Sequence, residues 1–83
     1  MSAAKEHPDK FQIFVNGQHK TWDKKRITYV EVVNLAFPSH GENEMFTVTY
    51  DHGPHNSKGT LVEGQDVEVT SGMRFVIDRT GKS

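Results

Sequence analysis

The sequence predicts an α+β fold, in which one helix packs on one face of a mixed sheet of four to five strands. One stretch, 27–38, has apolar residues at helical spacing and ends in a proline. The other apolar residues mostly alternate with polar ones, which is the period of a strand. The pair Asn16-Gly17 is a strong signal for a tight hairpin, because both residues tolerate a positive φ. The expected order is therefore a hairpin, a helix and further strands.

Length and charge limit the possible functions. The chain has 83 residues, enough for one domain with a small core. Ten Lys and Arg against eleven Asp and Glu make it nearly neutral, which argues against nucleic acid or an anionic membrane as a partner. It has no cysteine, and therefore no thiol chemistry of its own. Without a membrane-spanning apolar run or a signal peptide, a cytoplasmic protein is expected.

The first elements form the hairpin. Residues 1–9 are small, polar and charged, and we expect them to be a flexible leader to a domain spanning 10–78. The first strand is predicted at about 10–16, with Phe14 on the face opposite to Phe11, Ile13 and Val15. A turn at Asn16-Gly17 leads into a second strand at about 18–22.

The helix is predicted from about Tyr29 to Phe37. Thr28 and Glu31 have the spacing of a capping box, in which each side chain satisfies a backbone N–H of the other. Pro38 ends the helix because it brings no N–H and disfavours helical geometry in the preceding residue. One face carries Tyr29, Val32, Val33 and Ala36, and of these we expect Val33 and Ala36 to be buried against Ile13, Val48 and Phe75.

The remaining strands complete the sheet. They are predicted at 45–50, 60–62, 67–69 and 73–78, and residues 79–83 are expected to be an exposed, unpaired tail. A hairpin followed by a crossover helix lets a later strand pair in parallel with the first. This layout is that of a β-grasp, or ubiquitin-like, roll.

The sequence contains no persuasive catalytic or metal-binding pattern. The run Thr80-Gly81-Lys82-Ser83 resembles the end of a phosphate-binding loop, but the first glycine of that motif and the following helix are missing. His52 and His55 lack further ligands at metal-binding spacing, and they are interpreted as exposed loop residues. We therefore expect no catalytic residue, metal or cofactor.

One surface is a candidate binding site. Phe14 and Val76 are apolar residues on the outward side of two strands that should be neighbours, beside Arg74 and Thr47. Single exposed apolar residues are common, so a recognition role and an incidental exposure both remain open at this point.

The sequence resembles a known family in addition. Gln12-Ile13-Phe14-Val15 is similar to the opening strand of ubiquitin. The closer resemblance is to the bacterial multiubiquitin-domain family of ubiquitin-like proteins, and it covers about 11–83. Its hallmarks here are Ile27-Thr28-Tyr29, Val32-Val33, Leu35-Ala36-Phe37-Pro38, Thr47-Val48-Thr49-Tyr50, Gly53-Pro54, Gly59, Leu61-Val62-Glu63-Gly64-Gln65, Val67, Val69, Gly72-Met73 and Phe75.

The resemblance implies a protein modifier rather than an enzyme. Gly81 would be joined to lysine amines of target proteins, after cleavage before Lys82. Arg79 and Thr80 would dock the tail on partner enzymes, which in such systems are a ubiquitin-activating-like enzyme, a ubiquitin-conjugating-like enzyme and a JAMM-type metallopeptidase, linked to antiviral defence. The chain departs from the family in having one domain and in ending Gly81-Lys82-Ser83 rather than in a free diglycine.

Two alternatives to a modifier remain. One is a ubiquitin-like adaptor that is not conjugated and binds partners through Phe14 and Val76. The other is a β-grasp sulfur carrier, which has the same fold and glycine end.

Overall fold

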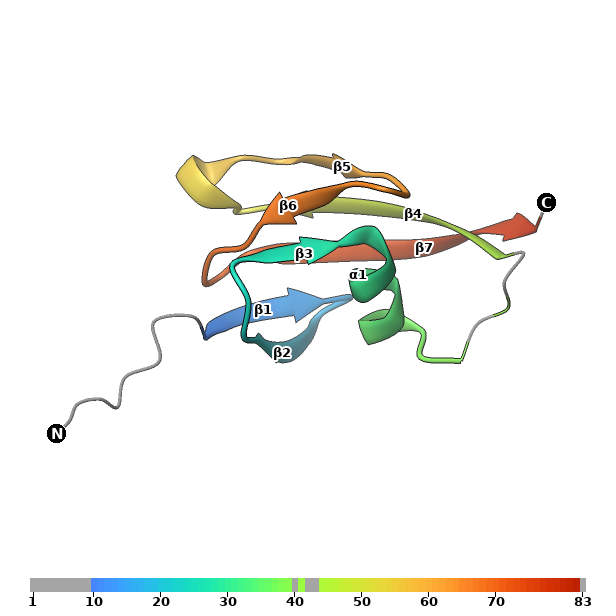
Figure 1. The fold of residues 1–83 in the computed structure, drawn as a ribbon, viewed down its shortest axis with the longest axis horizontal. Coiled ribbons are helices and arrows are strands. Elements are labelled where there is room, and N and C mark those ends of the chain that lie inside the picture. Colours follow the sequence, from blue (N-terminus) through green and yellow to red (C-terminus); the bar gives the residue numbers. More distant parts are fainter. Residues whose placement is uncertain (1–9, 40, 42–43, 83) are drawn as a thin grey trace, which may run out of the picture.

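The computed structural model describes residues 10–39, 41 and 44–82, so that the expected leader lies outside the described residues. The main layer is a five-stranded mixed sheet with one helix, α1 (Tyr29–Ala36), packed on one face (Figure 1). This confirms the predicted α+β, β-grasp architecture. In spatial order the strands are β2 (Gln18–Trp22), β1 (Phe11–Val15), β7 (Arg74–Lys82), β4 (Glu44–Asp51) and β5 (Gly59–Leu61).

The hairpin forms as its sequence predicts. Asn16 and Gly17 have φ angles of 52° and 82°, the left-handed geometry that a two-residue hairpin turn requires. The Asn16 side chain then extends the parallel pairing of β1 with β7. Its amide donates to the Ile77 carbonyl over 3.1 Å and its oxygen accepts from the Ile77 N–H over 2.8 Å. The turn residue therefore also fixes the register of the last strand.

The helix begins with the predicted capping box. The Thr28 hydroxyl accepts from the Glu31 N–H over 3.1 Å, and the Glu31 carboxylate accepts from the Thr28 N–H over 3.0 Å. Burial of Val33 confirms the predicted core face, and Val32 is buried beside it. Ala36 is only half-buried, because it is the last helical residue and lies at the margin of the core.

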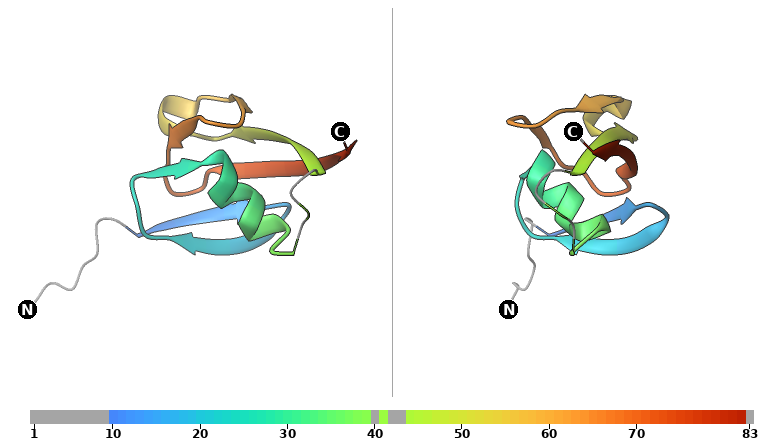
Figure 2. Two further views of the ribbon diagram at one scale, coloured as in Figure 1. Left: turned by 45° about the vertical axis from the view of Figure 1, so that its right-hand side comes forward. Right: turned by 90° about the vertical axis from the view of Figure 1, so that its right-hand side faces the viewer.

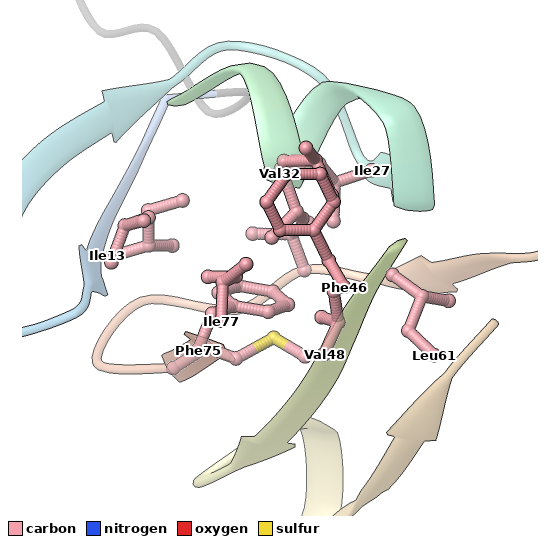
Figure 3. Packing of buried hydrophobic residues seen from close by; sticks show 12 residues of the cluster. Ile13, Ile27, Val32, Phe46, Val48, Leu61, Phe75 and Ile77 are labelled. Atoms are coloured by element: carbon pink, nitrogen blue, oxygen red, sulfur yellow. The ribbon is translucent and has the colours of Figure 1, made fainter. Parts of the chain in front are cut away.

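The core lies between α1 and the sheet (Figure 3). Side chains alternate along each strand, so every second residue of the central strands points towards the helix. Ile13, Val48 and Phe75 come from three neighbouring strands and are all buried, as expected. The buried apolar residues of the described chain are Ile13, Val15, Ile27, Val32, Val33, Phe46, Val48, Leu61, Val69, Met73, Phe75 and Ile77.

A second, two-stranded sheet was not predicted as such. It pairs β3 (Arg26–Thr28) with β6 (Asp66–Glu68) and places Ile27 opposite Val67. No strand was predicted at Arg26–Thr28, because a three-residue strand is too short to show alternation. The one-turn 3-10 helix η2 (Pro54–Asn56) lies in the connection between β4 and β5.

The expected unpaired tail after Asp78 is wrong for the described residues. β7 continues to Lys82 and stays paired with β4, with Phe46 opposite Arg79, Met45 opposite Gly81 and Glu44 opposite Lys82. A register shift between Met45 and Phe46 leaves Thr80 as an extra residue, which is a β-bulge. The last residues of β7 are held by backbone pairing with β4 and not by burial of apolar side chains. A prediction based on apolar residues therefore ends this strand too early.

Candidate functional site

Four side chains form a row across the outer face of the sheet, the face away from α1. Figure 2 shows that the helix covers only one face. Phe14 is paired with His19 on β2 and with Arg74 on β7, and Arg74 is paired in turn with Asp51 on β4. Directly opposite residues project from the same face. Segments that are far apart in the sequence therefore meet here.

The row combines an aromatic pair with an ionic cluster. The rings of Phe14 and His19 meet edge to face, with centroids 5.6 Å apart. Arg74 Nε donates to Asp51 Oδ1 over 3.2 Å and its second nitrogen to Oδ2 over 3.4 Å, while His52 Nδ1 lies 2.9 Å from Oδ1. The hydrogen bonds from Arg74, and after them the contact with His52, hold the pKa of Asp51 below its ordinary value.

Val76 and Arg74 stand between two shallow hollows. One, of about 490 Å³, is lined by Phe14, Gly17, Asp51, Arg74, Phe75 and Val76. The other, of about 470 Å³, is lined by Thr49, Tyr50, Asp51, Lys58, Gly59, Thr60, Arg74 and Val76. Val76 is 50% exposed, on the solvent-facing side of the strand at the centre of the sheet. Val76 therefore presents apolar surface beside the charged Arg74, and both residues line each of the two hollows.

We call Phe14, Arg74 and Val76 the outer patch. The structure brings these three predicted residues together, but it places Thr47 farther along β4. Thr47 is exposed and faces Asp78, whereas Thr49 is the residue opposite Val76. Thr47 is therefore at the margin of the outer patch.

The sequence analysis missed His19, Thr49 and Asp51 as neighbours of the outer patch. Their contribution depends on the register between strands distant in sequence. Only His19 carried a local signal, since a hairpin with an Asn-Gly turn places it opposite Phe14.

The predicted conjugation site lies at the other end of β7. Arg79 is opposite the buried Phe46, so it faces the helix side rather than the outer patch. The Thr80 hydroxyl donates to the Met45 carbonyl over 3.1 Å. The predicted docking residues Arg79 and Thr80 and the predicted reactive Gly81 are thus part of the sheet.

Neither a metal site nor a membrane-spanning helix is found in the described part of the chain. No group of three or more His, Cys, Asp or Glu side chains is placed there to hold a metal ion. The Nδ1 atom of His52 contacts the Asp51 carboxylate. His52 and His55 both have positive φ angles, 57° and 58°. No helix among the described residues is long and apolar enough to cross a membrane.

Comparison with known proteins identifies the family. The model of the multiubiquitin family matches residues 11–81. This chain belongs to the multiubiquitin family. The match confirms the predicted resemblance and identifies the domain as ubiquitin-like. A search of the curated proteins and a search of the solved structures each gave no match.

The multiubiquitin match contains every candidate site residue except Lys82. It includes the outer patch, the marginal Thr47, and the docking residues Arg79 and Thr80, and it ends at Gly81. The last residue of the matched multiubiquitin domain is therefore Gly81, the residue predicted from the sequence as the conjugation site.

Proposed function

We propose that this multiubiquitin domain is a protein modifier that is conjugated through Gly81 to lysine amines of target proteins. The observation that carries the proposal is the family match, which ends at Gly81 and leaves Lys82 and Ser83 beyond it. The chain itself supplies a fold, a docking surface and a carboxylate. The reacting cysteines and the metal belong to its partners, so the chain is not an enzyme.

The proposed reaction has four steps after trimming. A JAMM-type metallopeptidase adds water across the Gly81–Lys82 bond, which releases Lys82-Ser83 and leaves a Gly81 carboxylate. An activating enzyme joins this carboxylate to the α-phosphate of ATP and releases pyrophosphate. The thiolate of the activating enzyme then takes the acyl group and displaces AMP. The thiolate of the conjugating enzyme takes the acyl group next and displaces the thiolate of the activating enzyme. A target lysine amine then displaces the thiolate and forms an amide.

Glycine suits the reacting position for a steric reason. It has no Cβ, so it reaches backbone geometries closed to other residues and fits a narrow active-site channel. Arg79, two residues earlier, has a planar guanidinium that can bind a carboxylate of a partner through two parallel hydrogen bonds.

The outer patch is the proposed docking surface for these partner enzymes. It lies on β1 and β7, so a partner that binds it is placed beside the strand that carries Gly81. Phe14 and Val76 supply apolar area, and the Arg74–Asp51 pair supplies polar groups that two hydrogen bonds hold in a fixed orientation. We propose that the pathway operates in the cytoplasm of a bacterium and serves antiviral defence.

Mass spectrometry tests the proposal directly. The chain is incubated first with the cognate peptidase, and then with ATP, the activating enzyme, the conjugating enzyme and target protein. A chain shortened by Lys82-Ser83 and then joined through Gly81 to a lysine amine is the expected result. A thiocarboxylate at Gly81 instead of an amide would identify a sulfur carrier.

A non-conjugated adaptor is the second candidate, and one observation favours it. The end of β7 is paired with β4 as far as Lys82, so Gly81 is held in the sheet rather than presented to a partner. An adaptor would bind partners through the outer patch and would stay untrimmed. An intact chain recovered in complex with the partner enzymes would support this second function over the first.

A further inference from the structure

The end of β7 is fastened to the helix side of the molecule by one side chain. Arg79 is opposite Phe46, whose ring is buried, so both side chains point towards α1. Arg79 Nε lies 3.3 Å from Glu44 Oε1. Its guanidinium also lies over the Phe37 ring, 5.2 Å from the centroid, and Phe37 stacks on Phe46 with ring centroids 5.2 Å apart.

These contacts join three elements that are separate in the sequence. Phe37 is the C-cap of α1, Glu44 begins β4, and Arg79 lies in the last part of β7. A cation over an aromatic face and beside a carboxylate gains from both, and most when the site is partly shielded from water. The Arg79 side chain is 50% exposed, whereas that of Glu44 is only 17% exposed.

The environment of the Glu44 carboxylate favours the ion pair with Arg79. Its Oε1 is enclosed and has no hydrogen-bond partner among the described residues, although Arg79 is within ion-pair distance. Arg79 therefore neutralises this atom by charge rather than by a well-aligned hydrogen bond. If the end of β7 detached, the Glu44 carboxylate would lose the counter-charge of Arg79, and with it the stabilisation that this partly shielded ion pair contributes.

We propose that Arg79, Glu44 and Phe37 form a latch that keeps Gly81 in the sheet until a partner opens it. Gly81 is paired with Met45 and Thr80 is bound to the Met45 carbonyl, so the chain from Thr80 onwards is not accessible to an active-site cleft while Arg79 is seated. The partner that opens the latch has a carboxylate that takes Arg79 away from Glu44. This inference rests on the proposed function, because it describes how the conjugation site is regulated.

Trypsin cleavage after Arg79 measures the latch without any partner enzyme. A protease needs an extended, detached segment around the bond it cuts, so the cleavage rate reports how often the end of β7 opens. The product is the chain that ends at Arg79, and intact mass spectrometry measures how fast this product forms. Glu44→Gln removes the charge and keeps the shape, and Asp66→Asn is the matched control.

The control breaks another Arg–carboxylate ion pair, which is more exposed than that of Arg79 with Glu44. Arg26 lies 3.2 Å from Asp66 in the β3–β6 sheet, away from β7. We expect Glu44→Gln to speed cleavage after Arg79 by about 3- to 10-fold, the range for losing one partly shielded ion pair, and Asp66→Asn to leave it unchanged. Equal rates for the parent and Glu44→Gln would overturn the latch, and so would equal acceleration by both variants.

A second variant protects the test against misfolding. If Glu44→Gln melts well below the parent, Phe37→Leu replaces it, because it removes the aromatic face under Arg79, keeps an apolar side chain and leaves the cleaved residue unchanged. Acceleration in Phe37→Leu supports the latch, and an unchanged rate overturns it. Because neither assay contains the conjugation enzymes, failure of the latch leaves the proposed function intact, and failure of conjugation leaves the latch intact.

Discussion

Phe14 on β1 and Arg74 on β7 are directly opposite each other in the parallel pair at the centre of the sheet. This pairing places an aromatic ring from the first strand beside a charged group from the last, and Arg74 is bound in turn to Asp51 on β4. The outer patch therefore exists only in the folded chain. A variant that removes one member without disturbing the core tests the patch as a binding surface.

Phe14→Ala is predicted to weaken binding of the cognate activating enzyme by about 1–3 kcal/mol, the range of an interface anchor. The fold should persist, because Phe14 is only half-buried and is outside the core cluster. Titration calorimetry measures the affinity and a thermal melt checks the fold. Val62→Ala is the matched control, since Val62 is also apolar and is 49% exposed but lies outside the outer patch. Equal affinities of Phe14→Ala and the parent would remove the patch from the proposed interface.

Val33→Asp is predicted to destabilise the domain strongly. Val33 is 2% exposed, so the substitution would bury a charge without a partner and destabilise by several kcal/mol, out of a total stability of about 5–15 kcal/mol. Val30→Asp is the control on the same helix, because Val30 is 53% exposed. Urea unfolding followed by circular dichroism compares the two. Similar midpoints for both variants would contradict the packing of α1.

The capping box predicts a pH dependence of stability. Burial alone raises the pKa of Glu31, but hydrogen bonds from Lys24 and from Thr28 outweigh this and hold it below its ordinary value. A carboxyl with a lowered folded pKa stabilises the fold above its unfolded pKa, about 4.3, and this stabilisation is lost as the pH falls through the folded pKa.

Glu31→Gln is the variant that isolates this contribution. At pH 7 it should be less stable than the parent by a few tenths of a kcal/mol, because solvent screens the Lys24 pair. The difference should shrink as the pH falls through the folded pKa of Glu31, below which the carboxyl is protonated in both states. Urea unfolding at pH 7 and at a series of acidic pH values measures it. A gap that widens in acid would mean that the sign of the pKa shift is wrong.

The features that were predicted correctly from the sequence are those that local interactions determine. The Asn16-Gly17 turn and the Thr28–Glu31 capping box each depend on residues within a few positions of one another, and both are confirmed. The helix face followed from the spacing of Val33 and its neighbours. The parallel placement of the last strand followed from the order of elements, because a crossover helix permits it.

Contacts between distant residues could not be predicted in the same way. The pairing of Arg79 with Glu44 requires the register of β4 and β7, including a bulge at Thr80 that no sequence pattern indicates. A charged tail without apolar residues is normally free, which is why the analysis ended the strand at Asp78. The ion pair of Arg74 with Asp51 depends on the same long-range register.

The reactive position gives the last prediction. A chain made to end at Gly81 should be adenylated directly by the cognate activating enzyme, measured as exchange of labelled pyrophosphate into ATP. The chain of 83 residues should give no exchange before it is trimmed, because its carboxylate is then on Ser83.

Gly81→Asp in the shortened chain should abolish exchange, since an added side chain with a charge blocks a channel shaped for glycine. Its melting temperature should stay close to that of the shortened parent, because Gly81 pairs near the end of a strand, where substitutions usually change stability by less than about 0.5 kcal/mol. Exchange by the untrimmed chain at the rate of the shortened one would show that Gly81 is not the activated residue.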